Sequence, residues 1–195
     1  MKKIIPVFFI LWQCSFLMFG QDDSIPAATL SEEQIEVFRV QAIKSVNDLS
    51  NYINIVSDKK ESATRKDANI NLAVKLFCTE NNTVETSSVN NSTVNLTPIR
   101  KYLVKLKMLP YKQVFIKWFD IYLSSSFTKG DDGNYYGTAT IYQKFEGIRE
   151  IGSYKDITKK NIQLVLIPEK SYDGFKVITE WKLKLGDIKV DETKF

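Results

Sequence analysis

The sequence of 195 residues contains no histidine and only two cysteines, and each shortage excludes a kind of chemistry. Without histidine, Ser-His-Asp and Cys-His nucleophile arrangements cannot form, and the commonest ligand of zinc is missing. The eight glycines are scattered, and none follows a strand into a helix at the spacing of a phosphate-binding loop. We therefore expect no metal site and no cofactor, and the sequence favours a protein that is not an enzyme.

The amino terminus has the three parts of an export signal. Two lysines near the start precede an apolar run over residues 4–19, which is interrupted at four positions, and polar chain begins at Gln21. A transmembrane helix needs about 20 apolar residues with few interruptions, so this run is short for an anchor. We predict a signal peptide over residues 1–20 that is cut before Gln21. A retained anchor and a lipid on Cys14 are the alternatives.

A signal of this kind places the working protein in the periplasm, on the cell surface or in the medium. Its removal takes two of the 27 basic residues, against 23 acidic ones, and leaves a nearly neutral chain. That balance gives no reason to expect nucleic acid as a partner, and we expect membrane contact only through the cleaved signal. Cys78 is then the one remaining thiol, and we interpret it as a small apolar core residue.

Two helices are predicted after a disordered lead at residues 21–29. Ser31 and Gln34 have the spacing of a capping box, and apolar residues then recur at three- and four-residue steps as far as Val56. A second helix is expected from about Ser62. Its inward side is predicted to consist of Ala68, Leu72, Ala73, Leu76 and Phe77.

A third, shorter helix is predicted after a strand at residues 83–89 and a loop at 90–95. Thr97 is expected to cap this helix, with Pro98 at its first position. One side of it is basic and consists of Arg100, Lys101, Lys105 and Lys107. A solvated helix face is the simpler interpretation of these residues, and a surface that binds an acidic envelope polymer or anionic lipid is the alternative.

The rest of the chain predicts four consecutive strands. Alternating side chains and glycine-containing turns place them at about residues 111–126, 134–147, 160–168 and 174–184. Residues 187–195 read as a charged tail that frays. The fold class is therefore α+β, with the N-terminal helices packed on a strongly curved antiparallel sheet in one domain over residues 30–186.

This order of elements resembles the nuclear transport factor two-like (cystatin-like cone) superfamily. The chain also resembles small exported proteins of Bacteroidetes-type bacteria, through Met18-Phe-Gly-Gln21 and the aromatic, lysine-rich strand Tyr111-Lys-Gln-Val-Phe-Ile-Lys-Trp118. The first resemblance implies a bent sheet whose mouth is closed by helices. It also implies that the concave side holds ligands or carries out acid–base chemistry.

The strands supply aromatic candidates for such a concave wall. The ligand-pocket candidates are Trp118, Tyr122, Tyr136, Tyr142 and Trp181. Asp120 lies in phase with Ile116 and Trp118, so it is the one candidate catalytic residue. The simpler interpretation of all six is structural, because aromatic residues favour strands and a strand-end aspartate is commonly solvated.

Two functions of different class remain open. The first is an exported, non-enzymatic binding or assembly module of the cell envelope. Its partner would be another protein, an envelope polymer, a small apolar ligand or a second copy bound through the sheet. The second is an isomerase- or dehydratase-like enzyme that uses Asp120 and a tyrosine on the concave face as an acid–base pair.

Overall fold

The computed structural model describes residues 29–174 and 176–194. The predicted signal peptide and most of the predicted lead lie outside these residues. The helices are α1 (Glu32–Ser57), α2 (Ala63–Lys75) and α3 (Ile99–Lys107). The strands are β1 (Thr83–Ser88), β2 (Asn91–Pro98), β3 (Gln113–Lys129), β4 (Tyr135–Ile148), β5 (Ser153–Asp173) and β6 (Lys176–Lys194).

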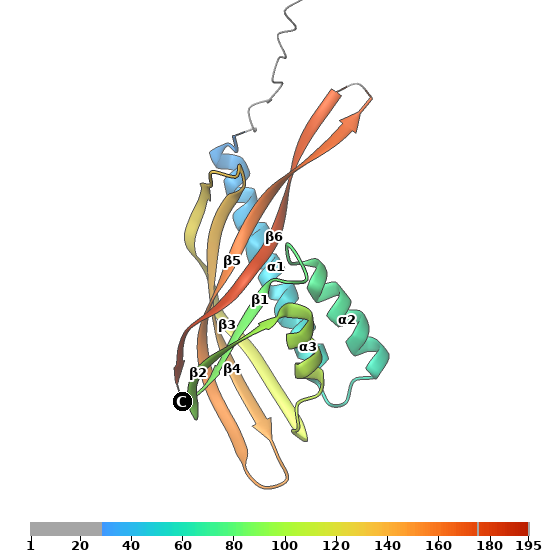
Figure 1. The fold of residues 1–195 in the computed structure, drawn as a ribbon, viewed down its shortest axis with the longest axis vertical. Coiled ribbons are helices and arrows are strands. Elements are labelled where there is room, and N and C mark those ends of the chain that lie inside the picture. Colours follow the sequence, from blue (N-terminus) through green and yellow to red (C-terminus); the bar gives the residue numbers. More distant parts are fainter. Residues whose placement is uncertain (1–28, 175, 195) are drawn as a thin grey trace, which may run out of the picture.

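The strands form one six-stranded sheet in the order β2-β1-β6-β5-β4-β3, and the three helices lie against one side of it. The long strands bend and twist around the helical layer (Figure 1). The predicted α+β class with helices on a curved sheet is confirmed, and the arrangement is consistent with the expected cone. The sheet is mixed rather than antiparallel, because β1 pairs with β6 in parallel at Val84 and Ile188.

The two N-terminal helices begin where the sequence predicts. Both hydrogen bonds of the capping box between Ser31 and Gln34 are present, and Ser62 caps α2 by accepting from the backbone N–H of Arg65. The inward side of α2 differs from the prediction, since Leu72 is 44% exposed while Val74 is buried. Ala68 is exposed as well. The buried face of α2 includes the polar residues Lys66 and Asn69. A search for apolar periodicity alone therefore does not identify this face correctly.

The predicted loop at residues 90–95 is wrong, because residues 91–95 belong to strand β2 and only residue 90 lies in the turn before it. This strand forms a hairpin with β1, from Ser88 opposite Asn91 to Thr83 opposite Pro98. The predicted cap by Thr97 is also wrong: Pro98 occupies the cap position, and its side chain makes no capping hydrogen bond. The backbone N–H of Ile99 instead donates to the carbonyl of Asn82 at 2.8 Å. Backbone hydrogen bonding within the hairpin therefore outweighs the preference of this polar segment for a loop.

The last two strands are longer than predicted. Residues 169–173 continue β5, and together with the start of β6 they form an arm that projects from the body of the molecule (Figure 1). Residues 187–194 belong to β6 rather than to a frayed tail, and Ile188 within them is buried. Asp187 fixes this end of β6 by accepting hydrogen bonds from the Thr83 N–H at 2.7 Å and the Asn82 amide at 3.1 Å.

Candidate functional site

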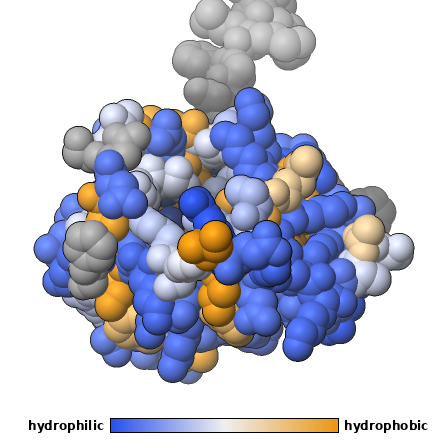
Figure 2. Space-filling view, turned by 90° about the horizontal axis from the view of Figure 1, so that it is seen from below, coloured by the Kyte–Doolittle hydropathy of each residue, from blue (hydrophilic) through white to orange (hydrophobic). Residues whose placement is uncertain are grey.

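A cavity of about 410 Å³, partly open to solvent, lies between the concave side of the sheet, helix α3 and the β1–β2 hairpin. Figure 2 views the molecule from below, where apolar side chains gather within a mainly hydrophilic surface. The apolar part of the cavity wall comes from α3, the segment after it, and strands β2, β3 and β4. It includes Leu96, Leu106, Leu109, Tyr111, Ile116 and Phe145.

Strand β5 supplies the polar part of the wall. Side chains alternate along a strand, so Asp156, Thr158 and Lys160 share one face. They are only 6%, 2% and 3% exposed, respectively. The hydroxyl of Tyr154 donates to Asp156 Oδ2 at 2.7 Å. The cavity thus contains a buried carboxyl group and a buried amine among aromatic and aliphatic side chains.

Lys160 reaches across the sheet toward β1 and α3. Its Nζ donates a long hydrogen bond of 3.4 Å to the carbonyl oxygen of Glu85, and it lies 5.9 Å from the centroid of the Tyr102 ring. The face of an aromatic ring attracts a cation, so Tyr102 provides part of the environment that replaces water around this amine.

Burial shifts the ionisation of three groups around the cavity. It lowers the pKa of Lys160 to about 8, although Asp156 and Glu85 favour the charged amine. It raises the pKa of Asp156, against the opposing effects of the Tyr154 hydrogen bond and the charge of Lys160. It also raises the pKa of Tyr102 to about 12. Perturbed groups gathered in a cavity are typical of functional sites.

Hydroxyl groups connect the floor of the cavity to the last strand. Thr193 on β6 donates to Thr158 at 3.3 Å and is also hydrogen-bonded to Ser87 on β1. The polar cluster is therefore held by three neighbouring strands, β1, β6 and β5. A site built on paired strands keeps its side chains in fixed positions more effectively than one built on a loop.

The structure does not gather the five predicted aromatic residues into one pocket. Trp118 is buried, and its indole N–H donates to Gln143 at 3.1 Å. Tyr142 stacks on Phe119 at 5.7 Å on the opposite face of the sheet from Gln143, and Tyr122 is 44% exposed. The remaining two candidates, Tyr136 and Trp181, lie toward the other end of the strands.

Tyr136 and Trp181 have local partners. The Tyr136 hydroxyl donates to Asp132 at 2.6 Å within the β3–β4 turn region. The ring of Trp181 lies edge-on to that of Tyr135, with 5.2 Å between centroids. Both residues therefore help to pack the molecule at a distance from the cavity that α3 covers.

Asp120 does not occupy the position that the sequence predicts. The register of β3 against β4 shifts between Phe119 and Tyr122, and Asp120 has a φ of +48° at this bulge. The bulge breaks the alternation, so Ile121 packs against the core while Asp120 is exposed. The prediction that Asp120 shares a buried face with Trp118 is wrong, because a bulge cannot be read from alternation alone.

The predicted basic face of α3 is partly neutralised. Arg100 pairs with Glu80 through two hydrogen bonds of 3.0 Å, and Lys107 pairs with Asp67 at 2.7 Å. Lys101 is exposed, whereas Lys105 lines the cavity. These four residues therefore do not present a uniform cationic surface.

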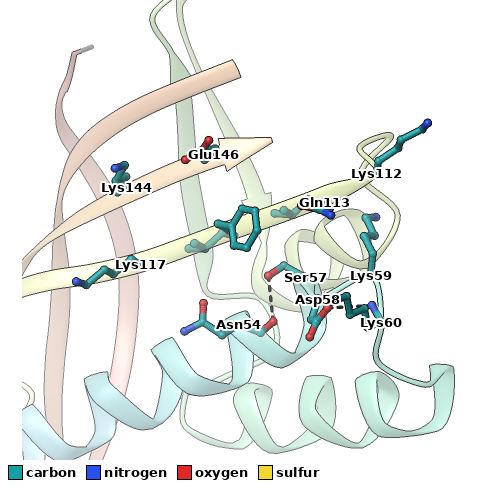
Figure 3. Close-up of a pocket in the computed structure, with 13 residues that line it drawn as sticks. Asn54, Ser57, Asp58, Lys59, Lys60, Lys112, Gln113, Lys117, Lys144 and Glu146 are labelled. Carbon is teal, nitrogen blue, oxygen red and sulfur yellow. Dashed lines mark hydrogen bonds between the residues drawn. The ribbon is translucent and has the colours of Figure 1, made fainter. Parts of the chain in front are cut away.

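A second hollow of about 620 Å³, also partly open to solvent, lies between the C-terminal end of α1 and strands β3 and β4. Its labelled lysines spread around the rim rather than converging (Figure 3). Lys59 donates to the carbonyl of Leu109 at 2.6 Å, while Lys112 and Glu146 pair with residues outside the hollow. These three charged groups thus connect neighbouring elements, and the cavity beside α3, with its buried carboxyl group and amine, is the better candidate site.

Other features that bear on chemistry are few. Within residues 29–174 and 176–194, no three Asp, Glu or Cys residues are grouped so that they could hold a metal ion. In the same part of the chain, no helix has the length and apolar character needed to cross a membrane. Burial raises the pKa of the half-buried Cys78 thiol, which makes it a weaker nucleophile.

The sequence predictions named Lys105 but missed the buried polar residues of the cavity. Tyr154, Asp156 and Thr158 lie before the predicted start of the third strand, and Lys160, with which they alternate, is the predicted first residue of that strand. That alternation of polar side chains was the available signal, and it indicates a strand with one polar face.

Comparisons with known proteins identify no family for this chain. No protein-family model matches the chain, and no curated protein matches it. One similar solved structure is described as the "Crystal structure of Putative Scytalone Dehydratase" from Novosphingobium aromaticivorans, with 11% sequence identity and a TM-score of 0.43. The match covers 83% of this chain and 90% of that chain. A likeness of this strength says nothing about the function of the present chain.

Proposed function

We propose that this chain is an exported binding protein that holds a small, partly apolar ligand in the cavity beside α3. The observation that carries the proposal is the cavity itself, which combines an aromatic and aliphatic wall with a few buried polar groups. Small-molecule sites are typically concave, mainly apolar and between about 300 and 1,000 Å³, and a few polar groups fix the orientation of the ligand.

The lining defines the kind of ligand that fits. A ring or short hydrocarbon can pack against Leu106, Tyr111 and Phe145. A hydroxyl, carbonyl or similar polar group can then meet Asp156 and Lys160 at the floor. A purely apolar ligand would keep water from these two groups and leave each with only its hydrogen bonds inside the protein, and that carries a free-energy cost.

Export supports the same function. The amino-terminal segment has the composition of a cleaved signal, and the nearly neutral remainder has no compositional mark of a nucleic-acid-binding protein. A binding protein of the envelope needs a preformed site and no catalytic set, and the absence of histidine fits that need.

Acid–base catalysis is a second candidate, and Asp156 favours it. Burial raises the pKa of this carboxyl group, and Tyr154 holds it inside the cavity. A carboxyl group in such a place can exchange a proton with a ligand, so Asp156 replaces Asp120 as the candidate catalytic residue. Catalysis predicts turnover of a bound ligand that Asp156→Asn abolishes while binding persists.

Calorimetric titration with 2-naphthalenemethanol, an apolar ring with one hydroxyl group, tests the binding function. Asn95 lies on β2 at the cavity, so Asn95→Trp should narrow it and weaken binding at least about tenfold, or about 1.4 kcal/mol. Val94→Trp is the matched control, because the neighbouring Val94 is exposed and is not among the residues that line the cavity. Absence of binding, or equal affinity in both variants, would contradict the proposal.

A further inference from the structure

We propose that Lys160 binds aldehydes and ketones covalently, as a reversible imine formed inside the cavity. This inference rests on the proposed ligand-binding function of the same cavity and names the class of ligand. The ligand would place its carbonyl carbon within reach of Lys160 Nζ. The apolar remainder of the ligand would pack against the wall formed by α3 and the adjoining strands.

The geometry leaves the amine available for this reaction. Lys160 is 3% exposed and lines the cavity. Its Nζ makes one long hydrogen bond, to the Glu85 carbonyl at 3.4 Å. Among the described residues, no carboxylate oxygen lies within 4.0 Å of Nζ, so no close ion pair holds the amine in its charged form. A buried lysine without such a pair is the usual setting of an imine-forming residue.

The surrounding charges agree with a partly neutral amine. Asp156 on β5 and Glu85 on β1 favour the charged form, but burial outweighs them and lowers the pKa of Lys160 to about 8. Tyr102 on α3 stays neutral, since burial raises its pKa to about 12. At pH 8 about half of the Lys160 amines are therefore neutral, against under about 1% for a solvated lysine.

The reaction balances without an oxidant or reductant. The neutral amine attacks the carbonyl carbon and forms a C–N bond, while the carbonyl oxygen becomes a hydroxyl group. Loss of that hydroxyl as water forms the C=N bond, and both amine protons end on the departing oxygen. Asp156 lies on the same face of β5, and its raised pKa suits it to pass a proton during the loss of water.

Reductive trapping tests this inference directly. The protein is incubated at pH 8 with 2-naphthaldehyde and sodium cyanoborohydride, which converts an imine to a stable secondary amine, and modified peptides are mapped by mass spectrometry. Lys160 should be modified at least about tenfold faster than Lys170, an exposed lysine on the same strand. Excess 2-naphthalenemethanol should slow the modification of Lys160 and leave that of Lys170 unchanged.

Two variants complete the test. Lys160→Arg should abolish the fast modification, and Lys170→Arg should preserve it. If Lys160→Arg does not fold, the rates of the two lysines in the wild-type protein still decide the question. Equal rates at Lys160 and Lys170, with 2-naphthalenemethanol still bound, would overturn the imine and leave the binding function intact. Failure of the alcohol to bind would overturn the binding function itself.

Discussion

Two ionisable side chains, Asp156 and Lys160, lie almost fully buried at the cavity floor. Removing a charge from water is unfavourable, so burial favours the neutral form of each group. It raises the pKa of Asp156 and lowers that of Lys160. They lie on the same face of β5, so each also reduces the cost of the other. A protein that needed only a packed core could use apolar residues at both positions, which is why we regard the pair as functional.

The stability contribution of Lys160 should depend on pH. Its folded-state pKa of about 8 lies below the unfolded value, so the native state releases its proton first as pH rises. Between these two values the unfolded state binds more protons, and stability therefore increases with pH. Relative to Lys160→Met, the wild type should gain up to about 3 kcal/mol of unfolding free energy between pH 7 and pH 10.5. Urea denaturation at both pH values measures this gain.

If the difference in unfolding free energy between the wild type and Lys160→Met is the same at both pH values, Lys160 titrates as a solvated lysine. Other titrating groups occur in both proteins, so most of their contributions cancel in the comparison. The Asp156 carboxylate is present in both as well. The result therefore reports on the environment of one amine.

Asp120 is predicted to be a structural residue at the β3 bulge. Its φ of +48° is a conformation that glycine adopts without strain, so Asp120→Gly should raise the unfolding free energy by a few tenths to about 1 kcal/mol. Asp120→Val should lower it by about 1–2 kcal/mol, because a branched Cβ is unfavourable there. Thermal or urea unfolding measures both. A loss of stability on substitution by glycine would show that the Asp120 side chain makes a contact that the bulge geometry does not explain.

At the scale of elements, the strongly patterned segments were the predictable ones. The capping box and apolar stripe of α1, and the alternation in β3 and β4, are local signals. Strand β2 and the end of β6 lack such signals, because they are rich in Asn, Asp, Glu and Lys, which are depleted in strands. They become strands because β1 and β5 offer unpaired edges, and hydrogen bonding along those edges outweighs local preference.

The end of β6 provides a test of that account. Ile188 is 2% exposed and pairs with both Val84 and Ile162, so Ile188→Ala should lower the unfolding free energy by about 2–5 kcal/mol. Its exposed neighbour gives the control: Lys189→Ala should stay within about 0.5 kcal/mol of wild type. Equal, small effects of both substitutions in urea denaturation would indicate a frayed tail, as the sequence alone suggests.

At the scale of the whole molecule, the order of elements was enough to predict the α+β class. The cavity was not predictable in the same way, because its lining comes from β1, β2, α3 and three later strands. The sequence shows which residues alternate within a strand, but not which strands become neighbours across the sheet. Residue type alone therefore pointed to aromatic residues for the pocket. Lys160 and Asp156 line it because of which strands and helix come together in the folded sheet.

The proposed export implies a defined processing event. Protein recovered from outside the cytoplasm should begin at Gln21, as measured by intact mass and N-terminal sequencing. Leu11→Arg places a charge in the apolar run, so it should leave the full-length chain inside the cell. Exported protein that still begins at Met1 would contradict a cleaved signal and favour a retained anchor.

The location of a bound ligand tests the central claim most directly. Methyl NMR spectra recorded during titration with 2-naphthalenemethanol should show ring-current shifts at Leu106 and Leu109, which line the cavity beside α3. Val114 lines the second hollow, beside α1, and its methyl signals serve as the reference that should not shift. Saturable shifts at the two leucines, with Val114 unchanged, are the result we predict. Shifts confined to Val114, or no saturable shifts at all, would contradict a ligand site inside the sheet.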